Sequence, residues 1–368
     1  MLKYKNIAKR IAGWIVALAL PVAASAAGDI CYLRDATAPS PTTAYLLCGQ
    51  GMVYATTDGG GHWAMQKLGA TPALRGAASA TMTDEQKEQL VMGSTPDLHA
   101  IAFRDDAHGF VVGNAGTIFA TDDGGKTWQT RLNDKKQPFT TEHLLAIQTI
   151  GNLAWASGFD GIILHSIDGG RTWEKQDSGT TMAIEGLYFL NPNLGWAVGW
   201  SGTILLTTDG GKKWQSITTA AATWSLTSVY FRDERNGWAV GFAGELLASH
   251  DGGLTWQALK SPVQSSLSSL AIDKAGRIWI AADEQLLVSE DGGQNWTAAK
   301  VDSNMFLSKV FGKGDSLWAL GELGLLKQVG STREWKEAEN FHPAGTSIAD
   351  SLESMTTGTQ SAAPATAK

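Results

Sequence analysis

The chain has 368 residues, of which 43% are hydrophobic and 18% are charged, and its formal net charge is −7. This composition is typical of a globular protein with a sizeable core and excludes a chain that is disordered throughout. The acidic balance argues against binding to nucleic-acid phosphates, so we expect no nucleic-acid partner.

Residues 1–26 predict a secretory signal peptide. Four basic residues within 3–10 precede an apolar run over 11–24, which leads into the small-residue cleavage site Ala24-Ser25-Ala26. An uncleaved membrane anchor is the alternative, but the run is short for a spanning helix and Pro21 interrupts it. Cleavage would change the net charge from −7 to −11 and leave a mature protein, periplasmic or otherwise exported, that does not span a membrane.

Two cysteines, Cys31 and Cys48, follow the predicted cleavage site. In an exported chain they predict one disulfide near the N-terminus. A metal or redox site is the alternative, but the pair lacks both a CxxC spacing and nearby histidines.

An octet repeats along the rest of the chain. Copies such as SIDGGRTW and SHDGGLTW end at Trp63, Trp128, Trp173, Trp214, Trp256 and Trp296, and a degenerate copy, VGSTREW, ends at Trp335. An aromatic anchor lies 17 or 18 residues before each of these tryptophans, at Tyr45, Phe110, Trp155, Trp196, Trp238, Trp279 and Trp318. After two longer spacings, the period settles near forty residues, which is typical of repeats built from four short strands.

The fifth repeat shows how these strands are arranged. Alternating hydrophobicity and turn residues predict an inner strand at 228–231, a second at 238–241, a third at 245–249 and an outer one at 256–259. Seven such units over residues 28–338 predict an all-β fold, a seven-bladed β-propeller with four-stranded antiparallel blades. All repeats contain four strands, so we expect no strand exchange between the ends. The tail 343–368 is rich in small and polar residues and is predicted to be disordered.

The octet matches the Asp-box, or BNR repeat. Its aspartate is expected to accept backbone N–H groups within a turn, while a following glycine takes a positive φ. Because the motif occurs in equivalent turns around a ring, we interpret its aspartates as structural rather than catalytic. A calcium site is the alternative, although DGG lacks alternating oxygen ligands. The aspartates concerned are Asp58, Asp123, Asp168, Asp209, Asp251 and Asp291.

Longer copies, such as YFRDERNGWAVGFAGELLASHDGGLTW (230–256) and YFLNPNLGWAVGWSGTILLTTDGGKKW (188–214), extend beyond the octet. The combination of F-x-D/N, GWAVG and DGGxTW resembles the repeat of the photosystem II stability/assembly factor family, over about residues 28–338. The resemblance implies an exported or lumenal propeller without enzymatic activity or cofactor, which helps membrane-protein complexes to assemble.

Sialidases also contain Asp-boxes, so a sialidase-like glycoside hydrolase, or a propeller that binds carbohydrate or another small ligand, is the alternative function. Such an enzyme needs one arginine cluster and a tyrosine nucleophile paired with a glutamate. Here Arg104 and Arg232 follow phenylalanines at equivalent places in two repeats, and Tyr188 and Tyr230 are likewise equivalent. Such repetition argues against a unique catalytic site.

Partner recognition is expected at the turn between the second and third strands. The alignment places Gly49, Asn114, Phe159, Trp200, Phe242, Asp283 and Glu322 at the tips of the seven turns. Three consecutive tips, Phe159, Trp200 and Phe242, are aromatic and predict a docking surface. The alternative is that each ring folds back and is covered. We expect a monomer whose partner is a protein of a membrane-associated envelope complex.

A second set of residues lies at the starts of the inner strands. His99, His143 and Glu185 align in the second, third and fourth repeats, with Trp224 and Ser225 near that level in the fifth. Two histidines and a glutamate are potential metal ligands, but equivalent positions around a propeller are usually too far apart to share one ion. We therefore predict no metal site.

Overall fold

The computed structural model describes residues 31–49, 51–68, 97–283, 285–299, 301, 305–313, 316–322, 324–330, 332–338 and 340–341. The predicted signal peptide, the predicted disordered tail and the insert at 70–96 lie outside these ranges. Every described strand belongs to one compact unit, Cys31–Pro343. Within the described ranges, no helix combines the length and apolar character that crossing a membrane requires.

The described strands form seven antiparallel sheets, each made of four consecutive strands. The first four sheets contain β1 (Leu33–Thr37), β2 (Ala44–Cys48), β3 (Met52–Thr56) and β4 (Ala64–Lys67); β5 (Leu98–Phe103), β6 (Gly109–Gly113), β7 (Ile118–Thr121) and β8 (Gln129–Thr130); β9 (Leu144–Ile150), β10 (Leu153–Gly158), β11 (Ile163–Ser166) and β12 (Glu174–Gln176); and β13 (Ile184–Phe189), β14 (Gly195–Gly199), β15 (Thr203–Thr207) and β16 (Gln215–Ser216).

The last three sheets contain β17 (Leu226–Phe231), β18 (Gly237–Gly241), β19 (Leu246–Ser249) and β20 (Gln257–Ala258); β21 (Leu267–Ile272), β22 (Ile278–Ala282), β23 (Gln285–Ser289) and β24 (Thr297–Ala298); and β25 (Leu307–Lys313), β26 (Ser316–Gly321), β27 (Leu325–Gln328) and β28 (Trp335–Glu337). Single 3-10 turns follow β6, β10, β14 and β18, namely η1 (Asn114–Gly116), η2 (Phe159–Gly161), η3 (Trp200–Gly202) and η4 (Phe242–Gly244).

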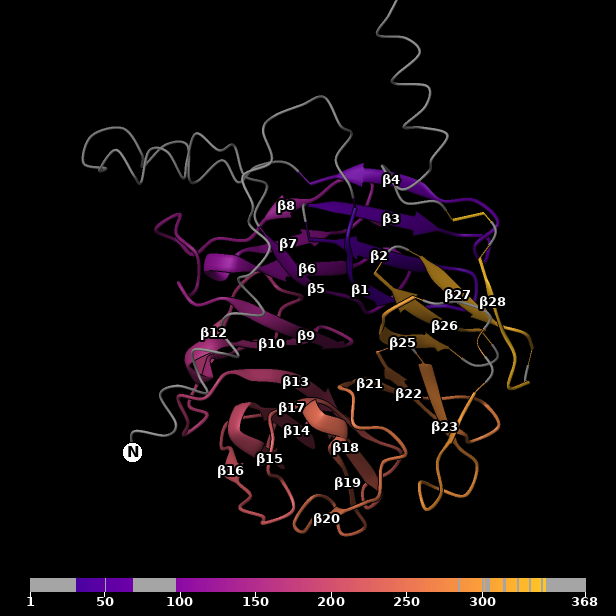
Figure 1. The fold of residues 1–368 in the computed structure, drawn as a ribbon. Helices are drawn as coiled ribbons and strands as arrows, with labels where there is room; N and C mark the ends of the chain where they lie inside the picture. The colour runs from indigo at the N-terminus through magenta and orange to yellow at the C-terminus, as the bar shows by residue number, and fades with distance from the viewer. Residues whose placement is uncertain are drawn as a thin grey trace, which may run out of the picture. The chain divides into compact units, whose positions relative to one another are not determined.

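The seven sheets are the blades of a propeller, numbered here 1 to 7 in chain order. Each innermost strand packs against the innermost strand of the next blade, and β25 returns to β1, which closes the ring (Figure 1). The predicted fold is therefore confirmed, and no strand is exchanged among the described sheets. The predicted outer strand 256–259 shortens to β20, because an edge strand with one free side holds few ladder bonds.

Adjacent blades are joined by the aromatic anchors. Trp196 of blade 4 stacks on Phe231 of blade 5 with ring centroids 3.5 Å apart, and its Nε1 donates to the carbonyl of Gly252 at 2.9 Å. The next residue, Gly253, has φ +89°, and a Cβ there would lie 2.5 Å from Trp196 Nε1. Blades 1 to 5 and blade 7 place their anchors against the Asp-box turn of the following blade in this way. At Gly253 the anchor occupies the space that a side chain would need.

The Asp-box aspartates hold these turns in shape. In blade 3, Asp168 Oδ1 accepts the N–H of Arg171 at 2.9 Å and of Thr172 at 3.0 Å, while Oδ2 accepts the Thr172 hydroxyl at 2.6 Å. Equivalent bonds to a backbone N–H four residues later occur at Asp58, Asp123, Asp209, Asp251 and Asp291. These hydrogen bonds fix the conformation of each Asp-box turn.

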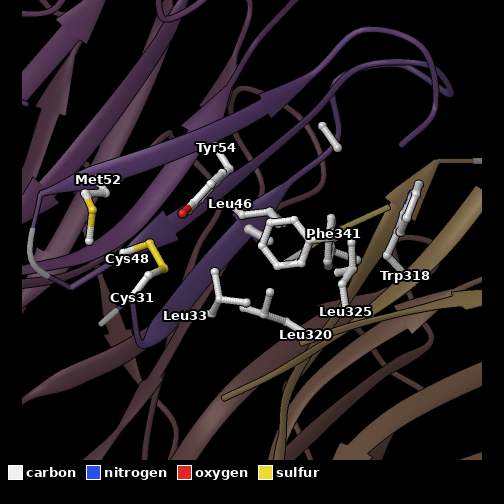
Figure 2. Packing of buried hydrophobic residues seen from close by; sticks show 13 residues of the cluster. Cys31, Leu33, Leu46, Cys48, Met52, Tyr54, Trp318, Leu320, Leu325 and Phe341 are labelled. Atoms are coloured by element: carbon white, nitrogen blue, oxygen red, sulfur yellow. A yellow bond between two sulfur atoms is a disulfide. The ribbon is translucent and has the colours of Figure 1, made fainter. Parts of the chain in front are cut away.

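The ring closes through a hydrophobic cluster between blades 7 and 1. Leu320 and Leu325 of blade 7 pack against Leu33 and Leu46 of blade 1, and Phe341, beyond the last strand, enters the same cluster (Figure 2). The anchor Trp318 meets the Asp-box glycine Gly60 as at other interfaces.

Cys31 and Cys48 form the predicted disulfide at the edge of this cluster, with a Cα–Cα distance of 5.3 Å. The bridge ties the segment before β1 to the end of β2 within blade 1. Closing a loop of this length in the unfolded chain contributes about 3 kcal/mol of stability. The bridge therefore secures the first inner strand at the place where the ring has its two ends.

At the interface between blades 6 and 7 the anchor has different contacts, because the degenerate seventh repeat lacks the DGG turn. Here Trp279 Nε1 donates to Asp273 Oδ2 at 2.9 Å within its own blade. Arg277 pairs with the same carboxylate oxygen at 2.7 Å. Trp335 of the degenerate octet packs edge-on against Trp279, so the anchor stays buried without its usual glycine partner.

Candidate functional site

The propeller has two faces that differ in the kind of turn they contain. The Asp-box face contains the turns between third and outer strands. The opposite face, here called the tip face, contains the turns between second and third strands and the described connections from an outer strand to the next inner strand. The predicted docking residues Phe159, Trp200 and Phe242 are the first residues of η2, η3 and η4, all on the tip face.

The three tips occupy one backbone position, as predicted. The N–H groups of Phe159, Trp200 and Phe242 donate to carbonyls just before the inner strands, namely those of His143, Ala183 and Ser225, at 2.9–3.0 Å. The next residue of each turn has a positive φ, between 53° and 56°. These turns are therefore fixed over the starts of β9, β13 and β17.

The tip side chains are half-buried. Their exposure is therefore intermediate between the two alternatives considered from the sequence, an exposed docking surface and covered rings. The Phe159 ring packs edge-on against Trp200 with centroids 5.5 Å apart and against His143 at 5.6 Å. These contacts link blades 3 and 4 into one apolar surface. Part of each ring nevertheless stays accessible to a partner.

Two more apolar side chains extend this surface, and the repeat pattern did not single them out as docking residues. Met182 is 41% exposed and Trp224 is 49% exposed, and both lie in connections that lead to inner strands. Trp224 adjoins Ser225, whose Oγ accepts the N–H of Ser201 in η3 at 3.3 Å. These connections vary in length between repeats, so an alignment of the blades gives little signal for them.

The exposed Trp224 is held by a buried acid. Glu245, which lies between η4 and β19 of blade 5, accepts the N–H of Thr223 at 2.6 Å and that of Trp224 at 2.5 Å. A large aromatic side chain on a fixed backbone loses little conformational entropy when it binds, so such residues are common binding hot spots. We name Phe159, Trp200, Phe242, Trp224 and Met182 the aromatic strip.

Glu185 lies at the base of the aromatic strip. It is the extra residue of a β-bulge in β13, where the pairing with β14 shifts between Ile184 and Gly186. Its Oε1 accepts the indole N–H of Trp200 at 2.5 Å. Burial raises the pKa of the Glu185 carboxyl, and the Trp200 hydrogen bond only partly offsets this effect.

The residues considered as metal ligands do not align as expected. His99 and Glu185 both occupy the bulge position, but His143 lies two residues earlier in its blade, where its carbonyl accepts the tip N–H of Phe159. The connection 131–143 is longer than those that lead to blades 4, 5, 6 and 7, so an alignment by sequence placed His143 two residues out of register. His99 Nε2 instead lies 2.6 Å from Asn114 Oδ1, and no group of three potential ligands occurs among the described residues.

The residues that suggested a sialidase are repeated structural contacts. Arg104 and Arg232 each bond their neighbouring aspartate at 3.4 Å, in equivalent turns. Tyr188 and Tyr230 lie side by side on β13 and β17 with ring centroids 4.7 Å apart. Burial raises the pKa of both phenols, so they stay protonated at neutral pH and are poor nucleophiles.

Comparison with known families agrees with this arrangement. A family model described as "Photosynthesis system II assembly factor YCF48" matches residues 77–187 and 176–264, which together span just over half of the chain. The chain belongs to this family. The YCF48 matches cover blades 2 to 5, including Phe159, Trp200, Trp224 and Phe242.

Individual relatives match over shorter stretches. The photosystem II assembly lipoprotein Ycf48 of Synechococcus sp. (strain CC9902) is 37% identical over 75 residues, 20% of this chain and 22% of that protein. The chloroplastic stability/assembly factor HCF136 of Oryza sativa subsp. japonica is 29% identical over 111 residues, 29% of this chain and 27% of that protein. The matches thus span between 19% and 27% of the curated relatives.

Solved structures share the fold. A structure described as YCF48 bound to D1 peptide superposes with a TM-score of 0.62 at 21% identity, covering 86% of this chain and 99% of that one. Virginiamycin B lyase from Staphylococcus aureus reaches the same TM-score at 11% identity, covering 79% and 92%. At these identities the likeness concerns the propeller fold alone, which enzymes and YCF48 proteins share.

Proposed function

We propose that this YCF48-family chain is an exported, non-enzymatic scaffold that helps a membrane-associated protein complex of the envelope to assemble. It acts as a monomer, without a cofactor, and binds a polypeptide segment of a subunit of that complex. The observation that most supports this function is the aromatic strip: apolar side chains on three neighbouring blades, gathered on the face whose loops differ from blade to blade.

Membership of the YCF48 family and the D1 peptide named with one solved YCF48 structure support binding to a peptide. The strip is also suited to it. Phe159, Trp200 and Phe242 are half-buried and so already ordered, while Trp224 and Met182 are more exposed. Partly buried aromatic anchors surrounded by accessible apolar contacts are typical of protein-binding surfaces.

Cross-linking in cells that produce the full chain tests this function. The wild type is compared with a variant that changes Phe159, Trp200 and Phe242 to alanine, and the captured envelope proteins are identified by mass spectrometry. A matched control replaces Ile167 and Leu254, two exposed apolar residues of the Asp-box face, by serine. We expect the triple variant to lose partners that the wild type and the control retain.

Because the tip rings are half-buried, the folding of the triple variant is checked by thermal unfolding. The double variant Trp224→Ala/Met182→Ala changes only the two most exposed members of the strip and serves as a second probe. Capture of the same partners at unchanged yield by both variants, each folded, would reject the tip face as the docking surface.

A further inference from the structure

Glu185 differs from the buried acids elsewhere in the propeller. Asp35 forms an ion pair with Lys309, and Asp273 forms one with Arg277. Glu245 is held by two backbone N–H groups. Glu185 accepts the Trp200 indole N–H, and it forms no ion pair with a cation of the described residues.

A partly desolvated carboxylate without a cation costs free energy, so such groups are unusual where they serve the fold alone. The inner strand of every blade has a bulge at this position, and only blade 4 has an acidic residue there. An apolar residue at position 185 would avoid this free-energy cost of desolvation, but the chain has a glutamate there. The Glu185 carboxylate is therefore a candidate to form an ion pair with a cationic group of a binding partner.

The surroundings of Glu185 are suited to a cation with a long apolar stem. Trp200, bonded to the carboxylate, packs against Phe159, and a positive charge is attracted to the faces of such rings. Met182 precedes Ala183, whose carbonyl accepts the backbone N–H of Trp200. Met182 therefore lies next to the turn that contains Trp200. Lysine and arginine side chains pack their methylene groups on apolar surfaces of this kind.

We propose that the aromatic strip binds a polypeptide segment through a lysine or arginine that pairs with Glu185 beside Trp200, with apolar neighbours of that residue on Trp224 and Met182. This inference rests on the proposed docking function and adds the chemistry of the partner. A polypeptide fits better than a small cationic ligand, since Trp224, exposed and fixed by Glu245, extends the surface beyond the carboxylate.

A phage-displayed library of random twelve-residue peptides provides the test. The library is selected against the wild-type protein, against Glu185→Gln, and against Glu234→Gln, which changes an exposed acid in a turn of the Asp-box face. Glutamine at 185 can still accept the Trp200 hydrogen bond, so the variant is expected to fold. We expect the wild type and Glu234→Gln to enrich peptides with one basic residue flanked by apolar ones, and Glu185→Gln to lose this preference.

The best peptide is then resynthesised with its basic residue replaced by norleucine, and fluorescence anisotropy measures the four combinations of peptide and protein. Norleucine should weaken binding to the wild type by about tenfold or more and leave binding to Glu185→Gln nearly unchanged. Equal weakening in both proteins, or enriched peptides without a basic residue, would overturn the pairing. Tight binding of choline that displaces the peptide would replace the polypeptide by a small cationic ligand.

The two proposals can fail separately. If the strip variants lose their envelope partners while Glu185→Gln shows no charge preference, the docking function stands and the cationic partner does not. If Glu185→Gln alters peptide choice while the strip variants keep their envelope partners, the cation site stands and the assembly function does not.

Discussion

The Asp-box face and the tip face use their repeated backbone in different ways. On the Asp-box face, side chains recur together with their contacts: Asp123 and Asp251 both accept the N–H and the hydroxyl of a threonine four residues later. On the tip face the backbone of η1 to η4 recurs, but the first residue changes from Asn114 to an aromatic in the next three blades. Repeated side chains therefore stabilise the ring, and the side chains that differ are available for recognition.

The largest expected effect comes from the anchor of an interface between blades. Trp196 is fully buried, whereas Trp224 on the tip face is 49% exposed. Trp196→Ala should lower the free energy of unfolding by about 3–5 kcal/mol, through lost packing and a cavity. Trp224→Ala should change it by less than about 0.5 kcal/mol. Urea denaturation followed by circular dichroism measures both, and similar losses for the two would undermine the contrast between the faces.

Glycines give a second comparison, with a smaller effect. Gly253 has φ +89° and is blocked by the buried ring of Trp196, while Gly179 on the tip face has φ +71° and an added Cβ there would meet nothing within 4 Å. Gly253→Ala should cost about 2–4 kcal/mol from strain plus overpacking. Gly179→Ala should cost only about 1–2 kcal/mol from strain. Thermal unfolding of the two variants shows whether the contact with Trp196 destabilises Gly253→Ala beyond the strain of the positive φ.

The Asp-box turns also predict a pH dependence. Hydrogen bonds from the side chain and backbone of Thr127 lower the pKa of Asp123 from 3.8 to about 2. A depressed pKa gives stability that is present above pH 4 and is lost as the pH falls towards 2. Asp123→Asn should therefore be less stable than the wild type at pH 6, by about 1 kcal/mol, and the difference should shrink on acidification. A difference that grows at low pH would contradict the structural role.

The repeated part of the molecule could be predicted well from the sequence. The spacing of tryptophans gave the number of blades, and Asp168 and Gly170 could be assigned to a turn, because each residue has the same contacts in many copies. The bridge between Cys31 and Cys48 could be expected from the predicted export and the count of cysteines. Local chemistry repeated along a chain leaves few alternatives for the fold.

The tip face could be predicted only in part, since no side chain recurs there in all blades. The equivalence of Phe159 and Trp200 follows from alignment, but their half-buried state depends on contacts between blades. The exposure of Trp224 depends on the buried Glu245, which lies 21 residues away in the sequence. His143 was placed two residues out of register, because the length of its connection differs from that of its counterparts.

The smallest expected effect on stability concerns Glu185, and its sign is opposite to that of Asp123. Burial raises the pKa of Glu185 above its ordinary value of 4.5, so the folded protein holds this proton more tightly than the unfolded chain. Its contribution to stability is then complete below pH 4.5 and declines as the pH rises through the folded-state pKa. Glu185→Gln cannot ionise, so at pH 8 its free energy of unfolding should exceed that of the wild type by about 0.5 kcal/mol. Urea denaturation measures this difference, which should disappear at pH 4. The exposed Glu234→Gln should show no such trend.

Stabilisation by Glu185→Gln together with weaker binding of basic peptides would place Glu185 among the tip-face residues that serve recognition. A loss of stability at pH 8 would instead place it with the residues that hold the ring together.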